Sequence, residues 1–243
     1  MKGICKLCLM ETKLNNSHII PEYFYKPMYD SKHRFFKLSR ELNIKNEFVQ
    51  KGLREYLLCN SCEQQINEYE KYANRVMFYE PPKNISQNSK IVIVEGIDYK
   101  LMKLFQLSIL WRSAVSTLPT FQEVKLGPHQ ERLRKMILNN YPGKYTDYGC
   151  LQTAIFMEEK KLADGLLMGV ELITYEGFRI YRFVFGGIIW LYYVSSHNRN
   201  FKLKNMFLQE NGTLTITKYP FEEVKFLMNF GIDLHKQGKL NAS

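Results

Sequence analysis

Cys5-Lys6-Leu7-Cys8 and Cys59-Asn60-Ser61-Cys62 are two Cys-x-x-Cys pairs that together contain four of the five cysteines in a chain of 243 residues. Two residues between cysteines allow one tight turn to present both sulfur atoms to one ion, and a tetrahedral Zn²⁺ takes four such ligands. The spacing predicts a structural zinc site. A redox pair needs only one such motif, and four unrelated buried thiols would not repeat the spacing. The isolated Cys150 is interpreted as a small core residue.

The second pair leads directly into a helical pattern. Leu57-Leu58-Cys59 precedes residues 62–72, in which Ile66 and Tyr69 recur with the period of a helix. A turn with the first pair, an intervening β-ribbon and a helix opened by the second pair predict a treble-clef zinc domain over residues 1–80.

Two further motifs accompany the cysteine pairs, Ser17-His18-Ile19-Ile20-Pro21 between them and Leu58-Cys59-Asn60-Ser61-Cys62-Glu63 around the second. On these motifs, residues 3–75 resemble the zinc-containing HNH, or ββα-metal, endonucleases, where a His-Ile-x-Pro-like motif and a Leu-Cys-x-x-Cys-His motif occur in this order. The resemblance implies metal-dependent hydrolysis of phosphodiester bonds in nucleic acid. By analogy it also suggests a bacterial anti-phage or restriction system, with a protein partner from that system.

Carried over to this chain, the resemblance makes His18 the general base that activates water, a task suited to the ordinary imidazole pKa. Glu63 stands where the family has a metal-binding histidine, and its carboxylate would hold Mg²⁺ or Mn²⁺. Ser17 replaces a metal-binding Asp or His, and Arg54 replaces an asparagine. Two alternatives stay open: His18 as a capping or core residue, and Glu63 as a carboxylate favoured by the helix dipole.

Non-catalytic recognition is the alternative function. In that case the zinc module would serve as a scaffold that binds nucleic acid or a protein partner, and the HNH-like motifs would have no hydrolytic role.

The formal net charge of +10 and the pI of about 9.2 favour a polyanionic partner. Residues 22–50 interleave aromatic and basic side chains, a composition that can stack bases and hold phosphates. The predicted phosphate contacts are Arg34 and Lys37, followed by Lys26 and Arg54, with DNA expected rather than RNA. Aromatic packing of a small zinc domain with solvated charges is the alternative.

The remainder of the chain carries no recognisable chemical motif. Residues 81–89 are expected to be a linker, and residues 90–243 an α+β domain of unknown role with a mainly antiparallel sheet. Trp111 is expected in the core with Arg112 on the surface, and Glu68 and Glu70 are expected in solvent. The expected strands are 90–96, 151–157, 166–174, 178–185, 188–195 and 214–217, the expected helices are 101–118, 128–140 and 221–230, and 197–204 is a basic loop.

No run of about 18 uncharged apolar residues is present, so an integral membrane protein is not expected. The first residues contain no apolar leader, which favours a cytoplasmic, reducing location. The Asn-x-Ser/Thr triplets at Asn84 and Asn211 are then chance matches.

Overall fold

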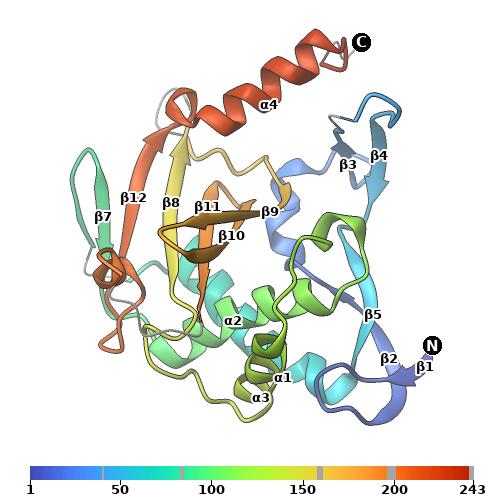
Figure 1. Ribbon diagram of the computed structural model, residues 1–243, viewed down its shortest axis with the longest axis vertical. Coiled ribbons are helices and arrows are strands. Elements are labelled where there is room, and N and C mark those ends of the chain that lie inside the picture. The colour runs from blue at the N-terminus through green and yellow to red at the C-terminus, as the bar shows by residue number, and fades with distance from the viewer. Residues whose placement is uncertain (40, 83–84, 158–160, 196–200, 241–243) are drawn as a thin grey trace.

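The computed structural model describes residues 1–39, 41–82, 85–157, 161–195 and 201–240. In this part of the chain three sheets and several helices form an α+β structure in which most neighbouring strands are antiparallel, as the sequence predicts (Figure 1).

A three-stranded antiparallel sheet and one helix form the N-terminal part. Leu14 pairs with Cys59 and His18 with Arg54 along the ladder between the second and third of these strands. The following helix buries Ile66, which anchors its apolar face. The elements are β1 (Lys2–Ile4), β2 (Glu11–His18), β5 (Arg54–Cys59) and α1 (Asn60–Asn74).

A separate two-stranded hairpin lies between β2 and β5 in the sequence. It consists of β3 (Arg34–Lys37) and β4 (Glu47–Gln50). Phe35 points inward and is 8% exposed, and its ring centroid lies 5.5 Å from that of Tyr25. Two short 3₁₀ turns, Glu22–Phe24 and Lys26–Met28, precede the hairpin.

A seven-stranded sheet forms most of the rest, in the order β6-β7-β12-β8-β11-β10-β9. Only the pairing of β12 with β8 is parallel among these neighbours. The strands are β6 (Ile85–Gln87), β7 (Ile91–Val94), β8 (Cys150–Phe156), β9 (Met168–Tyr175), β10 (Phe178–Phe185), β11 (Ile188–Val194) and β12 (Leu214–Pro220).

The expected linker 81–89 is therefore not free of regular structure, because β6 pairs with β7 at the edge of this sheet. Of the expected basic loop 197–204, residues 197–200 lie outside the described part of the chain, and Phe201 is a buried side chain rather than a surface one.

The helix α2 (Tyr99–Val115) is buried on nearly every side. Asp98 caps it by accepting a hydrogen bond from the backbone N–H of Leu101 at 2.9 Å. Buried side chains of α1, α2 and the large sheet belong to one continuous hydrophobic cluster. The N-terminal part is thus packed against the rest of the molecule through α1 and α2.

Two further helices complete the fold, α3 (Pro128–Leu138) and α4 (Lys225–Lys236). Figure 1 shows α4 running from the end of β12 towards the β3–β4 hairpin. None of the helices in the described ranges combines the length and apolar character needed to span a lipid bilayer.

Candidate functional site

The four paired cysteines converge where β5 ends and α1 begins. All four Sγ atoms lie within 4.8 Å of one another, and Sγ of Cys8 is 3.8 Å from Sγ of Cys59. A tetrahedron with metal–sulfur bonds of about 2.3 Å has sulfur–sulfur edges of about 3.8 Å, so the cluster has suitable dimensions for one tetrahedral ion. The prediction that Cys5, Cys8, Cys59 and Cys62 can together hold a metal is confirmed.

The backbone around the cluster supports this arrangement. The N–H of Cys59 donates to Sγ of Cys5 at 3.3 Å, and Leu9 donates its N–H to the carbonyl of Cys5 at 2.9 Å. Leu9 adopts a left-handed conformation with φ of 64°, which closes the turn around the first pair. Local backbone geometry therefore directs both thiols of this pair to one point.

The thiols of the cluster differ in how readily they ionise. Burial raises the pKa of Cys8, and burial together with the neighbouring Cys59 raises that of Cys62. Burial also opposes ionisation of Cys59, but hydrogen bonds from Ser61 and Cys62 outweigh it and lower the pKa of Cys59 to about 6. A bound divalent ion would supply the positive charge that allows all four sulfurs to act as thiolates.

Cys150 belongs to β8 and not to this cluster. It is 1% exposed, which confirms its interpretation as a core residue. The buried Lys103 donates its ammonium to the carbonyl of Tyr148 at 3.1 Å, and burial lowers the pKa of Lys103 to about 8.

His18, the predicted general base, lies at the end of β2 and is bonded to Arg54. Arg54 donates from Nε to Nε2 of His18 at 2.8 Å. The imidazole is held in its neutral form because burial, followed by the charge of Arg54, lowers the pKa of His18 to about 4. A hydrogen bond to the backbone of Lys51 engages the ring as well.

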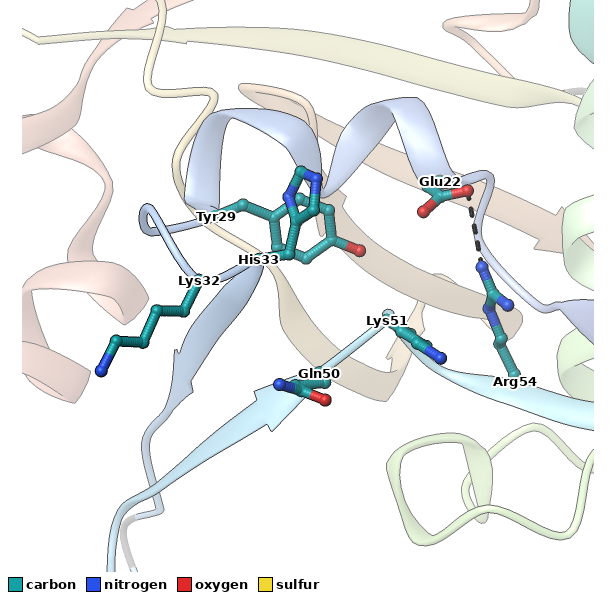
Figure 2. A pocket seen from close by; sticks show the side chains of 7 residues that line it. All are labelled: Glu22, Tyr29, Lys32, His33, Gln50, Lys51 and Arg54. Atoms are coloured by element: carbon teal, nitrogen blue, oxygen red, sulfur yellow. Dashed lines mark ion pairs between the residues drawn. The ribbon is translucent and has the colours of Figure 1, made fainter.

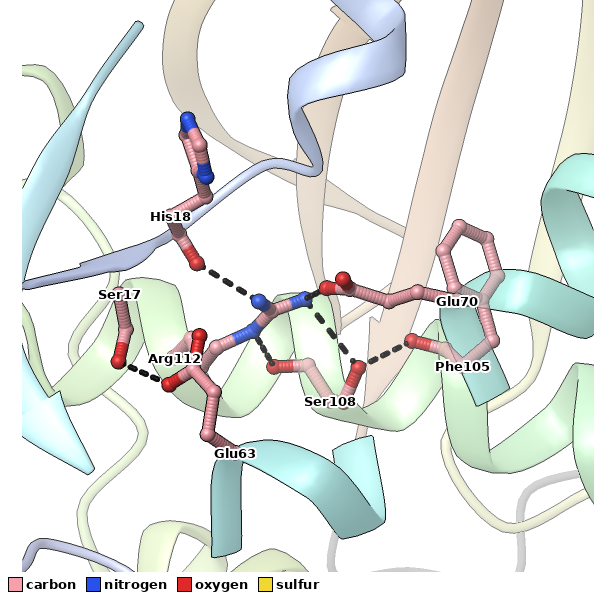
Figure 3. Close-up of polar contacts among 7 residues, drawn as sticks. All are labelled: Ser17, His18, Glu63, Glu70, Phe105, Ser108 and Arg112. Carbon is pink, nitrogen blue, oxygen red and sulfur yellow. Dashed lines mark hydrogen bonds and ion pairs between the residues drawn. The ribbon is translucent and has the colours of Figure 1, made fainter. Parts of the chain in front are cut away.

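Glu63, the predicted metal ligand, lies on the other face of β2. Its Oε2 accepts a hydrogen bond from the hydroxyl of Ser17, the residue before His18. Successive side chains of a strand point to opposite faces, so this bond places Glu63 on the side of β2 away from the imidazole (Figure 3). Within the described part of the chain, Glu63 joins no group of three or more His, Cys, Asp or Glu ligands. The fold does not bring His18 and Glu63 to one site.

Arg112 connects α2 to both α1 and β2. The interpretation of Arg112 as a surface residue is wrong: its side chain is 2% exposed and pairs with Glu70 at 2.6 Å. The expectation that Glu70 is solvated is also wrong, since burial raises the pKa of its carboxyl although the Arg112 charge opposes this effect. Arg112 also donates to the carbonyl of His18 at 2.6 Å (Figure 3). These bonds fix the end of β2 against the helices.

Three of the four predicted phosphate contacts have acidic partners. Arg34 forms two side-chain hydrogen bonds to Oδ2 of Asp30, Lys37 pairs with Glu47 at 3.2 Å, and Arg54 lies 3.5 Å from Glu22. Lys26 is exposed in its 3₁₀ turn.

A basic pocket of about 370 Å³ lies beside the Arg54–His18 pair, between the segment that precedes the hairpin, the end of β4 and the start of β5 (Figure 2). It contains three cations and one carboxylate, and of the predicted phosphate contacts only Arg54 lines it. Sequence reasoning noted Lys32 and His33 as part of the basic aromatic segment and missed Lys51. The lining residues are Glu22, Tyr29, Lys32, His33, Gln50, Lys51 and Arg54.

Lys51 is positioned by an unusual turn. Lys51 and Gly52 both have positive φ, 65° and 61°. A β-carbon at position 52 would lie 3.0 Å from the ring of Tyr25, so the turn requires glycine. The Lys-Gly dipeptide before β5 was the signal available in the sequence.

Comparison of the chain with protein-family models, curated proteins and solved structures finds no match. The geometry of the cysteine cluster and of the basic pocket therefore carries the functional argument.

Proposed function

We propose that this protein is a zinc-stabilised nucleic-acid-binding module whose basic pocket receives a phosphate group. The observation that carries the proposal is the lining of that pocket, where Lys32, Lys51 and Arg54 surround a space faced by the single carboxylate of Glu22. Nucleic-acid backbones are the polyanions that such cation clusters attract most strongly.

The ion proposed for the four-cysteine cluster is Zn²⁺, because a closed set of four thiolates is the usual structural zinc site. With zinc bound, the turn, ribbon and helix would form the treble clef expected from the sequence. A cytoplasmic location is part of this proposal, since reducing conditions keep the thiols available to the metal.

The two lysines are the side chains most available to a ligand. Among the described residues, the nearby ion pairs join Arg34 to Asp30 and Arg54 to Glu22, and none includes Lys32 or Lys51. A phosphate entering the pocket would gain both ammonium charges without breaking a salt bridge. Arg54 already shares its charge with Glu22 and His18, so its contribution would require rearrangement.

Salt-dependent binding tests the proposal. The zinc-loaded protein should bind a labelled oligonucleotide, and the slope of log Kd against log salt should fall by about 0.7 for each lysine removed in Lys32→Ala and Lys51→Ala. Lys100→Ala removes an exposed lysine elsewhere and serves as the matched control. Binding that is equally strong and equally salt-dependent in all variants would exclude the pocket as the phosphate site.

Hydrolysis of phosphodiester bonds by the same module is the second candidate, and one observation favours it. His18 is neutral at pH 7, and its Nε2 faces a guanidinium that lines the pocket. If a phosphate drew Arg54 away, Nε2 would be released to accept a proton from water. No step through Mg²⁺ or Mn²⁺ is derived, because Glu63 is bonded to Ser17 on the opposite face of β2.

Cleavage assays test this second candidate. DNA and RNA substrates, single- and double-stranded, are incubated with and without Mg²⁺ or Mn²⁺, using the unmodified protein, His18→Ala and Glu63→Gln. Hydrolysis with His18 as base predicts cleavage that His18→Ala abolishes and Glu63→Gln retains. Binding without cleavage under every condition would leave recognition as the function.

The bacterial defence setting and its protein partner rest on the HNH resemblance alone. Expression of the gene with and without His18→Ala in a phage-challenged host would test that setting directly: protection from infection supports it, and identical plaque counts with and without the gene argue against it.

A further inference from the structure

The β3–β4 hairpin presents an outward face made of aromatic and polar side chains. Phe36 and Phe48 stand directly opposite each other in the ladder. They are 45% and 56% exposed, and their ring centroids are 4.9 Å apart. Two phenyl rings paired in solvent are unusual on a surface strand, where exposed apolar area commonly marks a contact site.

This outward face extends into the basic pocket. Strand alternation places Arg34 and Gln50 on the same face as the two rings, and Gln50 lines the pocket. Two residues along a strand cover about 7 Å, so the rings lie about one extended nucleotide from Gln50. The two rings are tilted by 44° to each other, and the guanidinium of Arg34 lies over the ring of Phe48, 4.3 Å from its centroid.

The hairpin is held by contacts on two sides. Its inner face packs through Phe35, and Asp30 fixes Arg34 with two side-chain hydrogen bonds. The ammonium of Lys239, beyond α4, donates to the carbonyls of Ser39 and Ile44 at 2.8 and 2.9 Å. A two-stranded hairpin is weakly stable alone, so these contacts keep the rings in place before any ligand arrives.

We propose that Phe36 and Phe48 form a base-stacking platform for single-stranded nucleic acid, whose adjacent phosphate occupies the pocket between Lys32 and Lys51. Bases of a single strand expose their π-faces, whereas bases in a duplex are already stacked on one another. The charge of the neighbouring pocket favours this occupant over an apolar protein surface. The inference rests on the proposed function and adds to it a preference for unpaired strands.

The test compares single and double strands. Labelled oligothymidylate and a blunt duplex are titrated into zinc-loaded protein, into Phe36→Leu and Phe48→Leu, and into their double variant. We expect each substitution to weaken single-strand binding about tenfold, because a leucine keeps the apolar surface and loses the stacking. The salt slope should not change, since no phosphate contact is removed.

Phe48→Tyr is the conservative control for Phe48→Leu. It keeps an aromatic ring, so it should keep the affinity for the single strand. Both rings are exposed, so zinc content and unfolding midpoint should match those of the unmodified protein and exclude misfolding as the cause.

The outcomes separate the two proposals. Unchanged single-strand affinity in the leucine variants, with a reduced salt slope in Lys32→Ala, overturns the platform and leaves the pocket intact. Failure of the unmodified protein to bind any oligonucleotide at low salt removes both. Loss of self-association in the leucine variants without loss of oligonucleotide binding assigns the rings to a second copy of the chain and overturns the platform.

Discussion

Arg54 donates a hydrogen bond from Nε to Nε2 of His18 across 2.8 Å. A guanidinium is only a donor, so Nε2 must be the unprotonated nitrogen of the ring. The pair connects β2, which carries His18, to the basic pocket. The protonation state of His18 therefore depends on Arg54, which lines that pocket.

The first prediction concerns the pKa of His18, which lies at about 4 in the folded protein because of burial and the Arg54 charge. The ordinary value of about 6.5 applies to the unfolded chain. Between these values the unfolded state binds the extra proton, so stability rises with pH across this window and is lost as pH falls through it.

Two measurements check this prediction. NMR titration should show the His18 ring signals shifting only near pH 4. Denaturant unfolding of the unmodified protein and His18→Asn at pH 4.5 and pH 7 should show a larger pH effect in the unmodified protein. Acid release of metal affects both proteins and cancels in the comparison. A ring that titrates above pH 6 would contradict the buried, Arg54-bonded state.

The second prediction concerns the metal. The purified protein should contain one zinc ion per chain, and a strong chelator should lower its thermal stability by unfolding the N-terminal sheet and α1. Cys62→Ser should lose the metal, whereas Cys150→Ala should keep it, because Cys150 is buried in β8 outside the cluster. Metal analysis that finds no zinc, or full zinc content in Cys62→Ser, would contradict the assignment.

The third prediction concerns the buried pair of Arg112 and Glu70. Arg112→Met should reduce the free energy of unfolding by about 3–5 kcal/mol, because it leaves the Glu70 carboxylate buried without a partner. The double variant Arg112→Met/Glu70→Gln should recover part of this loss, because no buried charge remains. Urea unfolding of the two variants measures the difference. Equal stability of Arg112→Met and the unmodified protein would show that the pair does not stabilise the packing of α1 against α2.

The fourth prediction concerns the turn that positions Lys51. Gly52→Ala should cost about 1–3 kcal/mol, because it adds a β-carbon at positive φ and 3.0 Å from Tyr25. Gly96→Ala is the control, since Gly96 also has positive φ but no atom within 4 Å of the added carbon. Gly52→Ala should therefore be the less stable variant by urea unfolding and should bind oligonucleotide more weakly.

Local patterns in the sequence predicted the elements well. The strand expected at 178–185 corresponds to β10, and the helix expected at 101–118 corresponds to α2, which ends at Val115. The four cysteines could be assigned together because metal geometry restricts their spacing.

Relations between distant segments were not predictable in this way. Whether Arg112 is solvated depends on Glu70 of α1 and the carbonyl of His18, which only the packing of α2 brings together. Whether the predicted base His18 and the predicted metal ligand Glu63 meet depends on which face of β2 lies against α1. The bond of Ser17 to Glu63 shows that this is the face of Ser17, not that of the neighbouring His18. Lys51 lines the pocket because Lys51 and Gly52 form a turn with positive φ, and the sequence pattern alone does not show that conformation.

Ultraviolet cross-linking of the zinc-loaded protein to a single-stranded oligonucleotide, followed by peptide mapping, tests the central claim most directly. The account predicts cross-links within residues 29–54, at the pocket-lining Tyr29 and the hairpin rings Phe36 and Phe48. Cross-links confined to the seven-stranded sheet or to α4, with none in residues 29–54, would contradict it.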